Sequence, residues 1–138
     1  MNFHDFFHNI SFNRKLYFDD LIEKANLNMM EIEILVYIYR YPDNNTFTEI
    51  QRLKNYSKSH ISTSISHLIQ KDYLARENSL TNKKVYNLRL LEKSEPVIHE
   101  YFRCVTAFQK DAFKDINDNE LEHFKEILLK ISNNLQER

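Results

Sequence analysis

Residues 46–90 read TFTEIQRLKNYSKSHISTSISHLIQKDYLARENSLTNKKVYNLRL, and this stretch decides the fold. Thr46 or Thr48 can cap a short helix that contains Phe47, Ile50 and Leu53, and a turn at residues 54–56 follows. Ser57 is a good N-cap for a second helix, whose apolar residues recur at the spacing i, i+4, i+7 and i+8. Two short helices joined by a turn of about three or four residues are typical of a helix-turn-helix. We therefore expect residues 57–71 to form the second helix of this motif.

The hydrophobic period changes after this helix from about 3.6 residues to about 2. Residues 73–77 read as one strand, and residues 84–90 read as another in which Tyr86, Leu88 and Leu90 alternate with more polar neighbours. A polar segment with Lys83 lies between them, so the pattern predicts a β-hairpin with a basic tip. Because the chain has no glycine, Asn78 and Asn82 are expected to supply the left-handed turn conformations.

Amphipathic helical patterns flank this stretch on both sides. The first runs to about residue 24, and Asn28 can cap the next, which ends at the turn Pro42-Asp43-Asn44-Asn45. After the hairpin, helices are expected over about residues 92–113 and after Asn117. The sequence therefore predicts a single domain over residues 1–138 that is mainly α with a small β-hairpin wing. We expect residues 28–91 to form a winged helix-turn-helix, and the terminal regions 1–25 and 92–138 to form a helical dimerisation frame.

Positive charge is concentrated in the central third of the chain. Residues 46–90 hold eight lysines and arginines against three acidic residues, a net charge of +5 within a chain whose total is −1. The rest of the chain is therefore acidic. A compact basic block in an acidic frame favours binding to a polyanion such as nucleic acid.

The composition argues against several other classes of protein. The absence of glycine removes phosphate-binding glycine loops and the glycine-dependent nucleophile elbow, and no HExxH or CxxC motif is present. We expect no enzymatic activity and no cofactor, and we assign no catalytic or metal-ligating residue. The single cysteine, Cys104, fits a reducing compartment, and no apolar run approaches the roughly 18–20 residues of a membrane span. With no leader-like segment at the N-terminus, we expect a cytoplasmic, soluble protein.

Nine of the ten phenylalanines lie outside residues 46–90, in the first helix and the last two. A small monomer has little interior in which to bury so many rings at its extremities. Burial against a second copy of the chain, at about 25 cal/mol per Å2 of apolar area, explains them better than packing within one subunit. The pattern therefore favours a homodimer.

From Asn28 to about Ser94 the chain resembles the multiple-antibiotic-resistance regulator (MarR) family. The family's wing carries Leu-x-x-Arg, then Asp-x-Arg, then Leu-Thr-x-x-Gly. Here Tyr73-Leu74-Ala75-Arg76, Asn82-Lys83-Lys84 and Leu90-Leu91-Glu92-Lys93-Ser94 stand in the same register. The resemblance implies a winged-helix dimer joined through its terminal helices, with residues 57–71 as the recognition helix and residues 78–84 as the wing. Because Asn82 and Lys84 replace the family's Asp and Arg, the ion pair that stiffens the wing is expected to be lost.

These observations together predict a sequence-specific regulator of transcription that binds double-stranded DNA as a homodimer. We expect a repressor that responds to a small-molecule effector of unknown identity. The recognition helix should enter the major groove, and the wing should reach the adjacent minor groove or backbone. The predicted DNA-binding residues are Ser57, Lys58, Ser59, His60, Ser62, Thr63, Ser66, His67, Arg76, Asn82, Lys83 and Lys84.

Two alternative functions remain open at this point. A metal-responsive regulator of the same fold would use histidine and glutamate side chains to bind zinc, and His4 and His8 have the i, i+4 spacing for it. A helical protein–protein adaptor would instead use the Phe-rich frame. Cys104 lies among apolar residues, so we expect a buried and inert thiol there rather than a redox switch.

Overall fold

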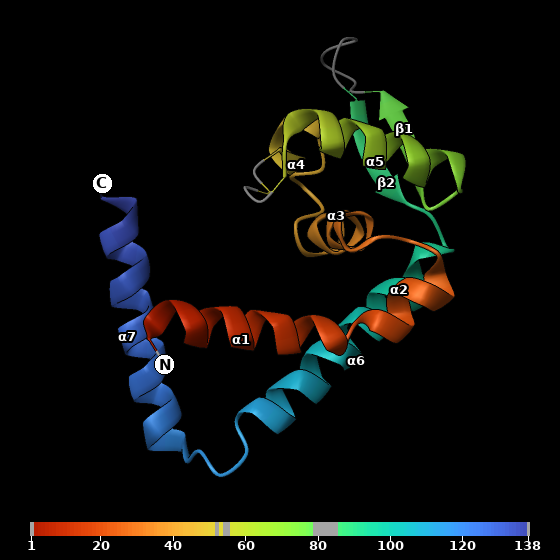
Figure 1. Ribbon diagram of the computed structural model, residues 1–138. Helices are drawn as coiled ribbons and strands as arrows, with labels where there is room; N and C mark the ends of the chain where they lie inside the picture. The colour runs from red at the N-terminus through yellow and green to blue at the C-terminus, as the bar shows by residue number, and fades with distance from the viewer. Residues whose placement is uncertain (1, 52, 54–55, 79–85, 138) are drawn as a thin grey trace. The chain divides into compact units, whose positions relative to one another are not determined.

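The computed structural model describes residues 2–51, 53, 56–78 and 86–137. In chain order the elements are α1 (Phe3–Leu16), α2 (Asp19–Ala25), α3 (Met29–Arg40), α4 (Phe47–Ile50), α5 (Lys58–Gln70), β1 (Leu74–Asn78), β2 (Tyr86–Leu90), α6 (Ser94–Ala112) and α7 (Asp118–Gln136) (Figure 1). The chain divides into two compact units, residues 1–105 and residues 106–138. The predicted fold class is confirmed, because the first unit combines helices with one antiparallel hairpin.

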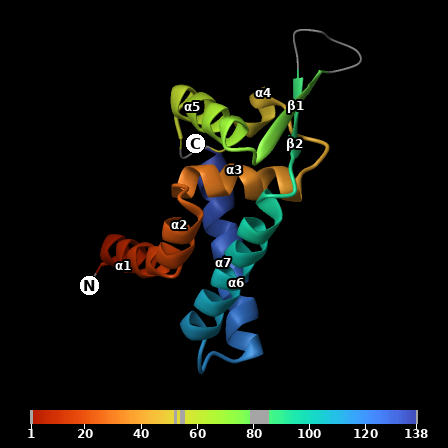
Figure 2. The same cartoon turned by 90° about the vertical axis from the view of Figure 1, so that its right-hand side faces the viewer.

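The first unit is built around α3. Asn28 begins this helix with a capping box, in which its side chain accepts from the Glu31 amide and the Glu31 carboxylate accepts from the Asn28 amide. α5, β2 and α4 contact α3, and both views show α5 and the hairpin on the same side of it (Figure 2). The core between them is made of aliphatic side chains: Ile32, Ile34, Leu35, Val36, Ile38, Ile50, Ile61, Ile65, Leu68, Leu74 and Leu88. This packing fixes the helix-turn-helix and the base of the hairpin as one body.

The hairpin pairs Leu74 with Leu90 and Asn78 with Tyr86. A short third segment extends the sheet, because Thr46 bridges to Asn87. In addition, the Leu88 amide donates to the Asn45 carbonyl at 3.0 Å, and the Asn45 side-chain amide donates to the Leu88 carbonyl at 2.8 Å. The start of α4 is thereby attached to the outer edge of β2. Residues 79–85, the predicted tip, lie outside the described residues.

The sequence prediction of one continuous first helix was wrong. α1 ends at Leu16, and α2 begins at Asp19 after a tight turn in which the amides of Tyr17 and Phe18 donate to the carbonyls of Arg14 and Lys15. The break lets the Phe18 ring enter the core, where it is 1% exposed and packs 5.3 Å from the Tyr101 ring. By contrast, α1 itself has no buried residue.

Among the described residues, the backbone reaches left-handed conformations at Asn26, Asp72 and Asp115. Asn and Asp tolerate this region better than other residues with a Cβ, so they can take the turns that glycine takes in other chains. The expectation for Asn78 was wrong, because this residue is the last of β1 and pairs with Tyr86. Asn82 lies outside the described residues.

In the second unit, α7 begins with another capping box, formed by Asn117 and Glu120. The Phe113 and Phe124 rings contact each other with centroids 6.4 Å apart. α7 has no buried residue, although it carries an apolar stripe. Across the described residues, no helix is both long and apolar enough to cross a membrane.

Candidate nucleic-acid interface

α5 has one anchored face and one exposed face. Ser57 caps it by accepting from the His60 amide at 3.3 Å, as its sequence predicted. On the inner face, Ile61, Ile65 and Leu68 are at most 1% exposed. Ser64 is also buried and directs its hydroxyl to the sulfur of Met30 at 3.1 Å. The inner face therefore fixes which side chains of α5 look outward.

The outward side chains are small and polar. All the predicted contact residues of this segment are exposed: Ser57, Lys58, Ser59, His60, Ser62, Thr63, Ser66 and His67. Hydroxyls donate and accept, so they can bond to base edges or to phosphate oxygens. No acidic side chain occurs in α5, so nothing on this helix repels a phosphate.

His67 differs from the other outward residues because it lies toward α3. Its Nδ1 is 4.0 Å from Oε2 of Glu31, a carboxylate that is 3% exposed. Glu31 carries no sequence signal of this position, since an acidic residue in the first turn of a helix is usually a solvent-exposed cap. Nothing in the local sequence places α5 beside it.

Two contacts join the strands of the hairpin near its base. The Arg89 guanidinium pairs with the Glu77 carboxylate across the sheet. On the other face, the Arg76 guanidinium lies 4.7 Å from the centroid of the Tyr86 ring. Asn82, Lys83 and Lys84 lie outside the described residues. The expected loss of the family's Asp–Arg ion pair at positions 82 and 84 therefore stays a prediction. The hairpin nevertheless holds a cross-strand ion pair at other positions, which sequence comparison with the family pattern did not reveal.

A second contact missed from the sequence fixes the start of α5. The hydroxyl of Tyr56 donates to Oε2 of Glu33 on α3 at 2.7 Å. Burial, together with this hydrogen bond to a carboxylate, raises the pKa of Tyr56 well above its ordinary value. The hydroxyl therefore keeps its proton and remains a donor beside the cap residue Ser57.

The end of α5 is held by two lysines. The Lys71 ammonium donates to the carbonyl of Asn26 at 3.0 Å, and the Lys93 ammonium donates to the carbonyl of Lys71 at 2.8 Å. A cation at the carboxyl end of a helix also interacts favourably with the helix dipole. Both ends of α5 are thus attached to neighbouring elements.

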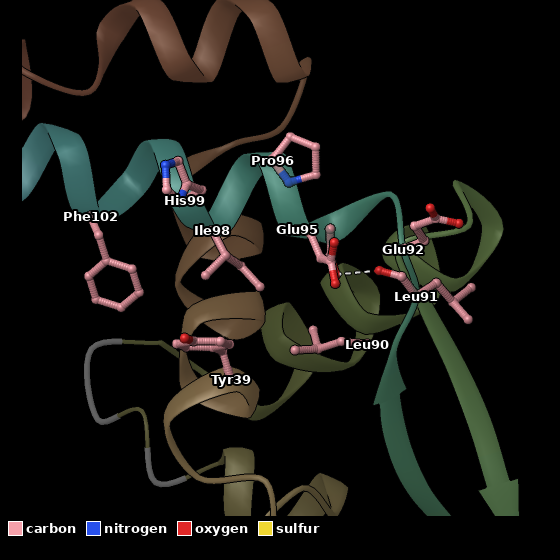
Figure 3. A pocket seen from close by; sticks show the side chains of 10 residues that line it. Tyr39, Leu90, Leu91, Glu92, Glu95, Pro96, Ile98, His99 and Phe102 are labelled. Atoms are coloured by element: carbon pink, nitrogen blue, oxygen red, sulfur yellow. Dashed lines mark hydrogen bonds between the residues drawn. The ribbon is translucent and has the colours of Figure 1, made fainter.

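A hollow of about 650 Å3 lies between the end of α3, the end of β2 and the start of α6 (Figure 3). The Tyr39 and Phe102 rings approach each other there with centroids 5.8 Å apart, and Ile98 lies beside them. The Glu95 side chain also belongs to the lining. A volume of this size fits a small organic molecule, and the lining offers aromatic rings together with a carboxylate.

The remaining residues that were candidates for sensing a signal are Cys104, His4 and His8. Cys104 is only half-buried, rather than buried as expected, and burial raises the pKa of its thiol. Such a thiol is less reactive than an ordinary one. The His4 and His8 rings stack with centroids 6.3 Å apart. Within the part of the chain that the structure describes, no three His, Cys, Asp or Glu side chains gather as a metal site would require.

Comparison with known proteins identifies the central region. The winged helix DNA-binding domain family matches residues 27–94. The crystal structure of MarR superimposes with a TM-score of 0.75 at 16% identity, covering 100% of both chains. A MarR protein from Peptoclostridium difficile gives a TM-score of 0.79 at 19% identity, covering 99% of this chain and 90% of that one.

A third structure, the S. aureus MepR–DNA complex, gives a TM-score of 0.82 at 17% identity, covering 97% of this chain and 98% of that one. Curated protein sequences give no match. At these identities the structures show a common fold, and the family match adds that the fold holds a DNA-binding domain. Residues 27–94 therefore match the winged helix DNA-binding domain family, and the chain has the same fold as the MarR crystal structure.

Proposed function

We propose that this protein is a MarR-type regulator of transcription, which binds double-stranded DNA as a homodimer and acts as a repressor. In this proposal α5 enters the major groove, and the hairpin reaches the adjacent minor groove or backbone. The observation that carries the proposal is the division of α5 into a buried aliphatic face and an exposed face of hydroxyl, imidazole and ammonium groups. A helix that reads base edges needs both, because the anchored face sets the register of the reading face.

The charges of this region support a polyanionic partner. Of the three acidic residues between positions 46 and 90, Glu77 pairs with Arg89, and Glu49 accepts from the Thr46 hydroxyl. Arg76 is exposed on β1, and Lys58 is exposed in the first turn of α5. These cations can contact phosphates on either side of the groove that α5 enters. MepR, which has a similar fold, has been crystallised with DNA.

The proposed dimer rests on apolar faces that each unit leaves exposed. In the first unit these side chains belong to α1: Phe3, Phe6, Phe7, Ile10, Phe12 and Leu16, with Phe3 80% exposed. In the second unit they belong to α7: Phe124, Ile127, Leu128, Leu129, Ile131 and Leu135. Contiguous apolar surface of this kind is rare on monomers and marks an interface. A second copy would cover these faces through an isologous contact, the commonest arrangement of homodimers.

The hollow beside Tyr39 and Phe102 supports regulation by a small molecule. A ligand held there would contact α3, the end of β2 and α6 at once. If the DNA-bound arrangement changes the distance between these elements, such a ligand would favour one arrangement over the other by its difference in affinity. We place the effector of the proposed repressor in this hollow.

Duplex binding under varied salt tests the DNA-binding function. The full-length protein is titrated into a fluorescent library of randomised duplexes, and the bound fraction is sequenced. We expect selection of a pseudo-palindrome with half-sites about 10 base pairs apart, and an affinity that falls linearly on a plot of log K against log salt. A protein that dimerises but shows no salt-dependent duplex binding would contradict the proposal and favour the protein–protein adaptor.

A further inference from the structure

The Glu31 carboxylate is placed where a carboxylate is costly. Its Oε1 accepts from the Asn28 amide at 3.0 Å, which completes the cap of α3. Its Oε2 is buried, and among the described residues no hydrogen-bond partner reaches it. A buried charge without a partner is unfavourable, because it loses the hydration that it has in the unfolded chain. The fold therefore keeps one oxygen that a cation or donor would stabilise.

His67 is the ionisable side chain that faces this oxygen. Its Nδ1 lies 4.0 Å from Oε2, and the imidazole is 54% exposed. An imidazole in water becomes cationic below about pH 6.5, where a carboxylate is still ionised. Protonation would thus convert a loose contact into an ion pair between α5 and α3.

Tyr73, Lys71 and Lys93 are other ionisable residues at the end of α5 that the structure describes, and each of them has a partner. The hydroxyl of Tyr73, which follows α5, donates to the carbonyl of Ala25 at 3.4 Å. The Lys71 ammonium donates to the carbonyl of Asn26, and the Lys93 ammonium donates to the carbonyl of Lys71 and lies 4.5 Å from the centroid of the Tyr73 ring. Burial raises the pKa of Tyr73, and the Glu31 charge raises it further, so the phenol adds no charge to the pair.

We propose that His67 is a positioning residue, whose protonation closes an ion pair with Glu31 and fixes α5 against α3. Duplex affinity then rises as the pH falls through the imidazole range, through Glu31 rather than through a phosphate contact. The inference rests on the proposed function, since it takes α5 as the reader of DNA. The sign follows from the charges: an ion pair that forms only with a cationic imidazole stabilises the docked arrangement at low pH, and this stabilisation is lost as the pH rises.

Unfolding in urea tests the pair without DNA. The variants are Glu31→Gln, which keeps an acceptor for the Asn28 amide but removes the charge, His67→Gln, and the double variant, each at pH 5.5 and pH 8.0. We expect a favourable coupling between the two positions at pH 5.5 that disappears at pH 8.0. A coupling of equal size at both pH values would overturn the inference, because it would reflect shape or packing alone.

Duplex affinity tests the consequence for α5. The wild type should bind about two- to fivefold more tightly at pH 5.5 than Glu31→Gln does, once both are normalised to their affinities at pH 8.0. Glu31→Gln retains every histidine, so it separates the ion pair from any direct effect of imidazole charge on the DNA. If Glu31→Gln keeps the full response, His67 acts on phosphate and the inference fails. If no variant binds duplex at any pH, the proposed function fails, and the urea cycle still decides whether the pair forms.

Discussion

The hydroxyl of Tyr56 donates to the Glu33 carboxylate at 2.7 Å, joining residues 23 positions apart in the sequence. Tyr56 stands directly before the cap residue of α5, and Glu33 is on α3. The bond therefore fixes where α5 begins relative to the helix that carries the core. Tyr56 therefore both donates this hydrogen bond and packs its ring against the core.

Tyr56→Phe should destabilise the protein by about 1 kcal/mol, because it removes the donor from a partly buried carboxylate and keeps the ring. The free energy of unfolding in urea measures this. Tyr39→Phe is the control, because that side chain is 57% exposed. Removing its hydroxyl should lower the free energy of unfolding much less. Equal losses for the two variants would show that the Tyr56 hydroxyl does not stabilise the fold.

Ser62→Ala and Thr63→Ala should each reduce duplex affinity by about 1 kcal/mol, the scale of a neutral hydrogen bond, and relax the preference at particular bases. Both residues are exposed on α5, so neither change should alter the unfolding free energy measurably. The measurement is selection from randomised duplexes, with Ser11→Ala on α1 as the control. If every variant selects the same motif with unchanged affinity, α5 is not the reading helix.

Where the decisive interactions are local, the sequence was enough to predict the structure. The N-cap at Ser57 and the stripe of Ile61, Ile65 and Leu68 are determined within one helix, and the structure confirms both. The break between α1 and α2 was not predicted, because it depends on contacts with residues that are distant in the sequence. The apolar spacing continues through residues 17–22, and only the core around Phe18 makes the turn favourable.

The same distinction applies to the candidate site. Exposure of the α5 side chains followed from the helical period alone. The buried carboxylate of Glu31 and the bond from Tyr56 to Glu33 did not, because each depends on elements that are distant in the chain and adjacent only in the fold. The hairpin shows both cases: alternation predicted its strands, whereas the pairing of Glu77 with Arg89 requires the register.

Replacing Lys83 and Lys84 with alanine should weaken binding to all duplexes alike. The slope of log K against log salt should fall by about one for each phosphate contact that is lost. Fluorescence anisotropy at several salt concentrations measures the slope. Lys125→Ala with Lys130→Ala, on α7, is the control with the same change in net charge. An unchanged slope in the Lys83 and Lys84 variant would show that the wing does not touch DNA.

Phe6→Glu with Ile10→Glu should dissociate the proposed dimer without unfolding the first unit, because α1 has no buried residue. Both side chains are exposed in the isolated chain, at 51% and 53%, so the glutamates meet water in the monomer and meet a hydrophobic partner only in the dimer. Sedimentation at micromolar concentration should change from dimer to monomer, while the circular dichroism spectrum stays helical. His8→Glu, at another exposed position of α1, controls for the added charge.

Removing residues 1–16 should have the same effect as the double change, whereas removal to residue 24 would also delete Phe18 and Leu21 from the core and destabilise the fold. A wild-type protein that sediments as a monomer would contradict the dimer, and with it the paired half-sites expected in its DNA.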